Sequence, residues 1–145
     1  MIRNKKYSSC LIFLLIFSTT LALYYPSLNY YFFQDDWFVL NWIKFQGPFS
    51  FFSFRTDIIY WRPITMPIFF KLNSILFGLN PIGYHIVAFL FHFINIILIA
   101  KILRELKVSK KSAIFGSFIY AISAFHFVPL SWLSTTSYIV GPTFI

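Results

Sequence analysis

Two adjacent acidic residues are the clearest sign of chemistry in this sequence. Asp35 and Asp36 follow a run of aromatic residues and directly precede Trp37. Neighbouring carboxylates raise each other's pKa, which suits a general base, and together they can hold a divalent cation. Alternatively, one aspartate caps a helix that begins at Trp37, because a carboxylate accepts hydrogen bonds from the backbone N–H groups there. Both roles fit one pair, with one aspartate at the cap and the other turned toward a site.

One arginine follows in the same part of the chain. Arg62 lies in the segment Tyr60-Trp61-Arg62-Pro63. Its guanidinium can bind a phosphate through two parallel hydrogen bonds. It can also reach lipid headgroups or pair with Asp57, and from chemistry alone these structural roles are favoured.

Three polar side chains interrupt a long apolar segment. His92 follows His85 by seven residues and Asn95 follows His92 by three, so a helix places all three on one stripe. At such depth, polar groups face the interior of a helix bundle, where hydrogen bonding between helices is favoured over a ligand or relay role. His126 lies near the end of the next apolar segment, and two positions are open to it: the outer cavity near Asp35 or the membrane interface.

The composition restricts the class of protein. Of the 145 residues, 59% are hydrophobic and 11% are charged, whereas soluble domains carry about 25% charged residues. Uncharged stretches at 7–33, 72–100 and 112–145 each exceed the roughly 20 residues that a helix needs to cross a bilayer. The sequence therefore predicts an all-α integral membrane protein that folds as a polytopic helical bundle.

Membrane-spanning segments are expected at residues 9–25, 82–101 and 112–128, and a further element begins within 129–145. Asn80 and Pro81 mark the start of the second segment, as helix cap and first helical residue. Pro129 is expected to interrupt the third.

The distribution of lysine and arginine predicts the orientation. Bases cluster at residues 3–6 and 101–111 and are sparse between 26 and 81. Because dense bases mark the cytoplasmic side, the N-terminus and the loop 102–111 are predicted to be cytoplasmic and the loop 26–81 to lie outside. The net charge of +8 is explained by these clusters beside apolar segments, where they meet the lipid bilayer, so no nucleic-acid partner is expected.

The outer loop contains two short amphipathic stretches. Residues 37–46 and 67–78 are too short to cross a bilayer and mix polar side chains with aromatic and aliphatic ones. We expect both to form helices that lie in the membrane interface.

Four motifs in order resemble the N-terminal region of GT-C membrane glycosyltransferases, most of all the protein O-mannosyltransferase-like and bacterial sugar-transferase branches. They are Phe33-Gln34-Asp35-Asp36, Tyr60-Trp61-Arg62-Pro63-Ile64-Thr65, Leu76-Phe77-Gly78-Leu79-Asn80-Pro81-Ile82-Gly83-Tyr84-His85 and residues 121–132. Their order and spacing agree with that family from about Tyr30 to Ser134.

The resemblance implies transfer of a sugar from a polyprenyl- or dolichyl-phosphate donor on the outer face of a membrane, here expected to be a bacterial cell membrane. It implies a catalytic role for Asp35 and Asp36, with a divalent cation as a possible helper held by the same pair. Arg62 would then neutralise the donor phosphate.

Two departures from the family pattern affect this interpretation. Ser123 and Val128 stand where protein-glycosylating relatives often carry His and Glu, which leaves the acceptor class open. Family members also have more membrane spans, so the chain is expected to be an N-terminal fragment that is inactive alone. The alternative is a small non-catalytic polytopic membrane protein, such as an assembly subunit or a transporter fragment.

Overall fold

The computed structural model describes residues 3–47, 50–52 and 62–145. Every regular element within these ranges is helical, which confirms the all-α prediction. The α-helices are α1 (Arg3–Tyr24), α2 (Asp35–Lys44), α3 (Phe69–Phe77), α4 (Pro81–Glu105), α5 (Lys110–Ala121), α6 (Phe127–Ser131) and α7 (Ser137–Val140). The short turns are η1 (Tyr25–Asn29), η2 (Ser50–Phe52), η3 (Ile64–Ile68), η4 (Ala124–His126), η5 (Leu133–Thr135) and η6 (Gly141–Phe144). Asp57, Tyr60 and Trp61 lie outside the described residues.

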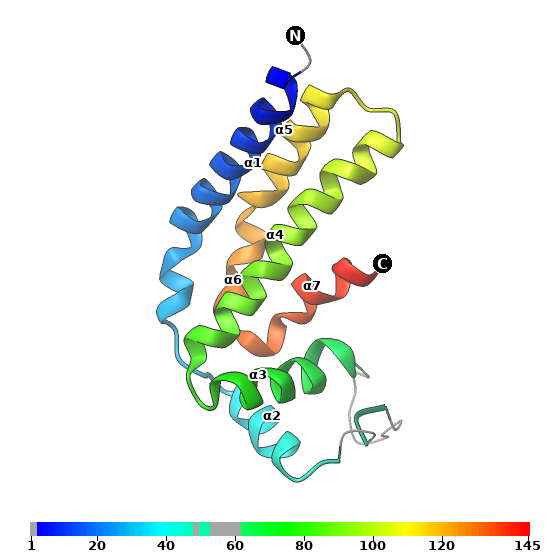
Figure 1. The fold of residues 1–145 in the computed structure, drawn as a ribbon. Coiled ribbons are helices and arrows are strands. Elements are labelled where there is room, and N and C mark those ends of the chain that lie inside the picture. The colour runs from blue at the N-terminus through cyan, green and yellow to red at the C-terminus, as the bar shows by residue number, and fades with distance from the viewer. Residues whose placement is uncertain (1–2, 48–49, 53–61) are drawn as a thin grey trace.

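The long helices run along the length of the molecule, and the short ones gather at one end. Figure 1 shows α4 and α5 side by side with α1 next to α5 and reaching to the end where the chain begins, and α2 and α3 across the opposite end. Helix α4 packs against α5 on one side and against α7 on another, so it is the central helix of the bundle.

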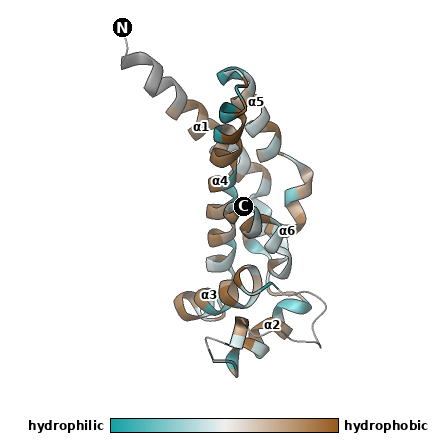
Figure 2. Cartoon of the chain, turned by 90° about the vertical axis from the view of Figure 1, so that its right-hand side faces the viewer, coloured by the Kyte–Doolittle hydropathy of each residue, from teal (hydrophilic) through white to brown (hydrophobic). Residues whose placement is uncertain are grey.

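Two helical segments are long and apolar enough to cross a membrane. They are Cys10–Asn29 and Pro81–Glu105, close to the expected 9–25 and 82–101. The second contains 25 residues, or about 37 Å of helix, and Figure 2 shows its largely hydrophobic surface. The expected third segment is a bent pair, Lys110–Ala121 and Ala124–Ser131, whose axes differ by 43°.

The bend in this pair comes earlier than expected. The helix breaks at Ile122 and Ser123, whereas Pro129 lies inside α6, where the first turn of a helix tolerates proline. A break leaves backbone carbonyls without helical partners, and both neighbouring helices supply donors. The Tyr24 hydroxyl donates to the Ser123 carbonyl at 2.5 Å, and His92 Nε2 lies 3.3 Å from the Ala121 carbonyl oxygen.

The start of α4 agrees with the sequence. Asn80 is the cap, and its side-chain oxygen accepts a hydrogen bond from the Ile82 N–H at 3.1 Å, while Pro81 is the first helical residue. Just before it, Gly78 ends α3 with a φ of 59°, a conformation that a residue without Cβ adopts at little cost.

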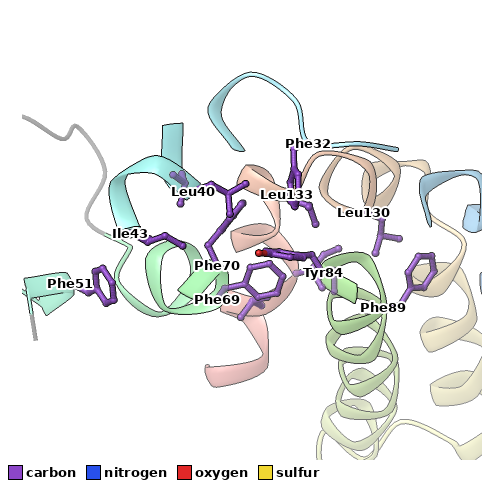
Figure 3. Close-up of a cluster of buried hydrophobic side chains, with 14 of the residues drawn as sticks. Phe32, Leu40, Ile43, Phe51, Phe69, Phe70, Tyr84, Phe89, Leu130 and Leu133 are labelled. Carbon is purple, nitrogen blue, oxygen red and sulfur yellow. The ribbon is translucent and has the colours of Figure 1, made fainter. Parts of the chain in front are cut away.

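The two short helices at the end of the bundle correspond to the amphipathic stretches of the sequence. They pack through an aromatic cluster against the first turns of α4 and the segment after α6, as Figure 3 shows. Tyr84 and Phe70 are fully buried at its centre, with ring centroids 5.8 Å apart. Helix formation at 37–46 and 67–78 is thus observed, with α2 and α3 at shifted boundaries.

The donor at the helix break supports a direct test. Replacing Tyr24 by Phe leaves the half-buried Ser123 carbonyl without this donor and should lower the free energy of unfolding by about 1–2 kcal/mol. Tyr25 is 58% exposed, so Tyr25→Phe is a matched control that should change stability by less than about 0.5 kcal/mol. Thermal unfolding in detergent measures both, and an equal loss in the two variants would contradict this role for Tyr24.

Candidate functional site

Asp36 is the most tightly held carboxylate in the described structure. Its side chain is 1% exposed. Oδ1 accepts hydrogen bonds from the Ser134 N–H at 2.6 Å and from the Ser134 hydroxyl at 2.5 Å. Oδ2 accepts from the Phe33 N–H at 3.0 Å. Since both oxygens are occupied, Asp36 joins the start of α2 to a segment 98 residues further along the chain.

The electrostatics of Asp36 differ from those expected for a pair of neighbouring carboxylates. Burial raises the pKa of Asp36, because removal from water disfavours its charged form, and the hydrogen bonds from Ser134 and Phe33 oppose this rise. The capping prediction was wrong: α2 begins at Asp35 rather than Trp37, and its cap residue, Gln34, makes no side-chain capping bond. Asp36 instead reaches back to Phe33, outside the helix.

Asp35 has the opposite environment. It is exposed at the first position of α2, where the free backbone N–H groups of the helix favour a negative charge. Gln34, directly before it, has a φ of 37° and a ψ of −104°, a sparsely populated conformation for a residue with a side chain. Such strained backbone is found at functional sites, where the surrounding structure holds it in place.

Arg62 lies half-buried at the start of the described segment 62–145. Its Nη1 donates to the Ser137 hydroxyl at 2.9 Å. The centre of its guanidinium lies 5.5 Å from the centroid of the Tyr138 ring, within the range of a cation–π interaction. The guanidinium is therefore anchored on α7.

The segment that holds Arg62 also holds Asp36. Ser134 binds the aspartate and Ser137 binds the arginine, and three peptide units separate these serines by no more than about 11 Å. The structure thus brings the two predicted site residues to one short stretch of chain. Asp35 lies near the same stretch because it directly precedes Asp36, which Ser134 binds.

His85 lies buried in the first part of α4. Its Nδ1 is 2.8 Å from the Leu130 carbonyl oxygen and its Nε2 is 3.0 Å from the Tyr30 carbonyl oxygen. A neutral imidazole carries one N–H and can donate to only one of these acceptors, while an imidazolium satisfies both. His85 therefore connects α4 to α6 and to the loop that precedes Asp35.

His126 belongs to a different cluster, deeper along the bundle. Its ring lies 4.5 Å from the His92 ring and 4.4 Å from the Tyr120 ring, centroid to centroid. His126 also lines a pocket of about 530 Å³ together with Asn95 and Tyr138. This pocket is not the one beside the acidic pair, and Tyr138, the ring beneath Arg62, also lines it.

An aromatic pocket adjoins the acidic pair. Its volume is about 480 Å³, and its lining residues are 30–33, 127–128 and 131–132. The hydroxyl of Ser131 and the indole N–H of Trp132 are buried and have no hydrogen-bond partner among the described residues. The pocket is therefore lined mostly by aromatic rings, as is typical of small-molecule sites.

A resident divalent cation does not fit this site. Asp36 uses both oxygens for protein donors, so Asp35 alone offers an open carboxylate. In the parts of the chain that the structure describes, no three His, Cys, Asp or Glu side chains gather as metal ligands. Divalent cations of the hard type need several oxygen ligands.

Sequence reasoning did not single out Ser134, Ser137 or Tyr138, which hold the site together. A signal was present, because residues 131–137 contain five hydroxyl side chains within an apolar stretch. Hydroxyl groups at this density in an apolar segment indicate polar contacts within the protein. Their partners are not readable from the sequence, because the contacts span large separations along the chain.

Comparison of the chain with protein-family models, with curated proteins and with solved structures gives no match. The class of protein therefore follows from its own features. The residues that the structure describes form helices and no strand, and two of these helices are long and apolar enough to cross a membrane, which suits a membrane-embedded protein.

The contacts of Asp36 lead to a stability test. Replacing Asp36 by Asn exchanges one carboxylate oxygen for an NH₂ group, which donates hydrogen bonds and does not accept them. Either the Phe33 N–H or the Ser134 groups then lose their acceptor. This should lower the free energy of unfolding by about 1–3 kcal/mol. The same change at the exposed neighbour, Asp35→Asn, should cost less than about 0.5 kcal/mol. Thermal unfolding at pH 7 measures the stability of both variants. Equal destabilisation would contradict the structural role given to the Asp36 carboxylate.

The pKa of Asp36 also predicts a pH dependence. Because burial raises this pKa above its ordinary value of 3.8, the folded protein binds the proton more tightly than the unfolded chain does. The resulting stabilisation is fully present below pH 3.8 and is lost as the pH rises through the raised pKa. The stability difference between wild type and Asp36→Asn should therefore narrow from about pH 4 upward. A series of melting temperatures measures it, and a gap that widens with pH would contradict the prediction.

Proposed function

We propose that the chain forms the N-terminal part of a membrane glycosyltransferase of the GT-C type. The enzyme transfers a sugar from a polyprenyl-phosphate donor to an acceptor on the outer face of the membrane. The N-terminus is cytoplasmic, and α2 and α3 lie in the outer interface. The apolar side chains of Ile75 and Leu76 on α3, 69% and 70% exposed, support contact with lipid at this depth.

The observation that carries the proposal is the unequal environment of the two aspartates beside the aromatic pocket. Asp36 is buried and saturated with donors, while Asp35, one residue earlier, is exposed. One carboxylate therefore fixes the start of α2 and the other is left available for chemistry. Phe33, two residues before Asp35, lines the pocket, so the available carboxylate lies near a space that can receive a ligand.

In this mechanism Asp35 acts as the general base and Asp36 positions it. Asp35 removes the proton from an acceptor hydroxyl, whose oxygen forms a bond to the anomeric carbon of the sugar. The bond between that carbon and the phosphate oxygen breaks, and the lipid phosphate departs with the electron pair. Arg62, anchored by Ser137 and Tyr138, neutralises the charge that develops on the phosphate.

The aromatic pocket suits a sugar. Its aromatic side chains give apolar rings for the C–H face of a pyranose. A pocket that is largely apolar is typical of small-molecule sites. The acceptor and the identity of the sugar remain open in this proposal.

The alternative is a non-catalytic polytopic membrane protein. One observation favours it: the Asp36 carboxylate and both nitrogens of His85 are occupied by contacts within the chain. These residues would then serve only to hold the helices together. Asp35 separates the two hypotheses, because no structural contact described here requires its charge.

Transfer measurements test this distinction. In membranes that contain the protein expressed from its full reading frame, Asp35→Asn should reduce transfer from a labelled polyprenyl-phosphate sugar by at least about 100-fold, because the general base is lost. Lys111→Gln removes an exposed charge on α5, at the other end of the bundle and outside the described pockets, and is the matched control. Arg62→Ala should also lower transfer, and Arg62→Lys should restore part of it.

Expression and insertion are matched for all variants. Unchanged transfer by Asp35→Asn would remove the carboxylate from the mechanism and favour the non-catalytic alternative. Loss of transfer in Lys111→Gln to the same extent would show that the assay reports membrane charge or insertion rather than chemistry.

A further inference from the structure

A second pocket lies at the opposite end of the bundle, away from the aspartates. It has a volume of about 460 Å³ and lies between α1, α4 and α5. Three of its lining residues are basic, Lys101, Arg104 and Lys110, and one, Glu105, is acidic. All four are exposed at the junction of α4 and α5, so the rim of the pocket carries two more positive than negative charges.

The pocket has an apolar floor and a basic rim because apolar and basic residues share one face of each helix. On α4, Ile97, Ala100, Lys101 and Arg104 line the pocket, and their spacing of three, four and seven residues puts them on one helical face. The apolar pair lies deeper along the helix and the basic pair nearer its end. On α5, Lys110 precedes two apolar lining residues at the same kind of spacing.

Small side chains create the hollow between the helices. Ala100 and Ala113 face it from α4 and α5, 7% and 0% exposed, and Phe13 closes it from α1. The floor is therefore apolar and the rim basic. Arg104 is oriented by a bond from Nη1 to the Val108 carbonyl at 2.7 Å, and a guanidinium has further N–H donors for another acceptor.

We propose that this pocket, which we name the basic pocket, binds the headgroup of an anionic phospholipid. The phosphate lies between Lys101, Arg104 and Lys110, and the first part of an acyl chain lies against Ala100, Ala113 and their apolar neighbours. The excess of positive charge selects an anionic over a zwitterionic headgroup, and the apolar floor selects a lipid over free phosphate. This inference is independent of the proposed transferase activity, because it concerns the other end of the bundle.

Binding of phosphatidylglycerol by the full chain in neutral detergent tests the proposal, with native mass spectrometry to count bound lipids. Wild type should retain phosphatidylglycerol in preference to phosphatidylcholine. Removing two rim charges in Lys101→Gln/Arg104→Gln should weaken binding of phosphatidylglycerol by about tenfold or more, since each base near an anionic headgroup contributes several-fold. Glu105→Gln should strengthen it.

The matched control is Lys107→Gln/Lys111→Gln. These exposed lysines belong to the same basic cluster but do not line the pocket, so this pair loses the same charge and should bind phosphatidylglycerol within about twofold of wild type. An equal loss in both double variants would overturn the proposal in favour of non-specific charge attraction. Competition by inorganic phosphate as strong as that by phosphatidylglycerol would also overturn it, because the apolar floor would then contribute nothing.

Discussion

The structure depends on one constraint: buried backbone carbonyls in an apolar bundle need donors from the protein itself, because no water reaches them in hydrocarbon. Helix α4 supplies these donors from one stripe. His85 meets the carbonyls of Tyr30 and Leu130, and Asn95 donates to the Ile139 carbonyl at 2.7 Å. Each contact fixes a segment that would otherwise expose polar backbone. Together with Tyr24 of α1, this stripe supplies donors to the irregular chain that follows α5.

That irregular chain in turn builds the candidate site. The chain continues through α6 toward the end of the bundle that holds α2 and then turns back along α7, as Figure 1 shows. The break at Ser123 on the way is held by Tyr24. Ser134 and Ser137 then reach Asp36 and Arg62. The polar stripe of α4 and the hydrogen bonds of the acidic pair are therefore parts of one arrangement, although they lie on different helices.

Much of the fold is predictable from the sequence, but most of the site contacts are not. The helical class, the Asn80 cap and the interior stripe follow from composition and spacing, which are local properties, and the structure confirms them. The hydrogen bond between Asp36 and Ser134 joins residues 98 positions apart, and no local rule gives such a pair. The position of the helix break was mistaken for a related reason. Pro129 is the obvious local signal for a break. The helix instead breaks at Ile122 and Ser123, because side chains of α1 and α4 contact the backbone carbonyls that the break leaves without helical partners.

The two aspartates illustrate how helix geometry alone can divide roles between neighbours. Successive residues of an α-helix point about 100° apart, so a pair at its start cannot bury both side chains against one surface. Once Ser134 holds Asp36 inward, Asp35 is directed outward and its backbone is fixed by its neighbour's bonds. A buried carboxylate such as that of Asp36, 1% exposed, cannot be reached by an acceptor hydroxyl. An exposed one on a fixed backbone keeps its lone pairs and gains a defined position. The buried residue thus contributes to chemistry only by limiting where the exposed one can lie.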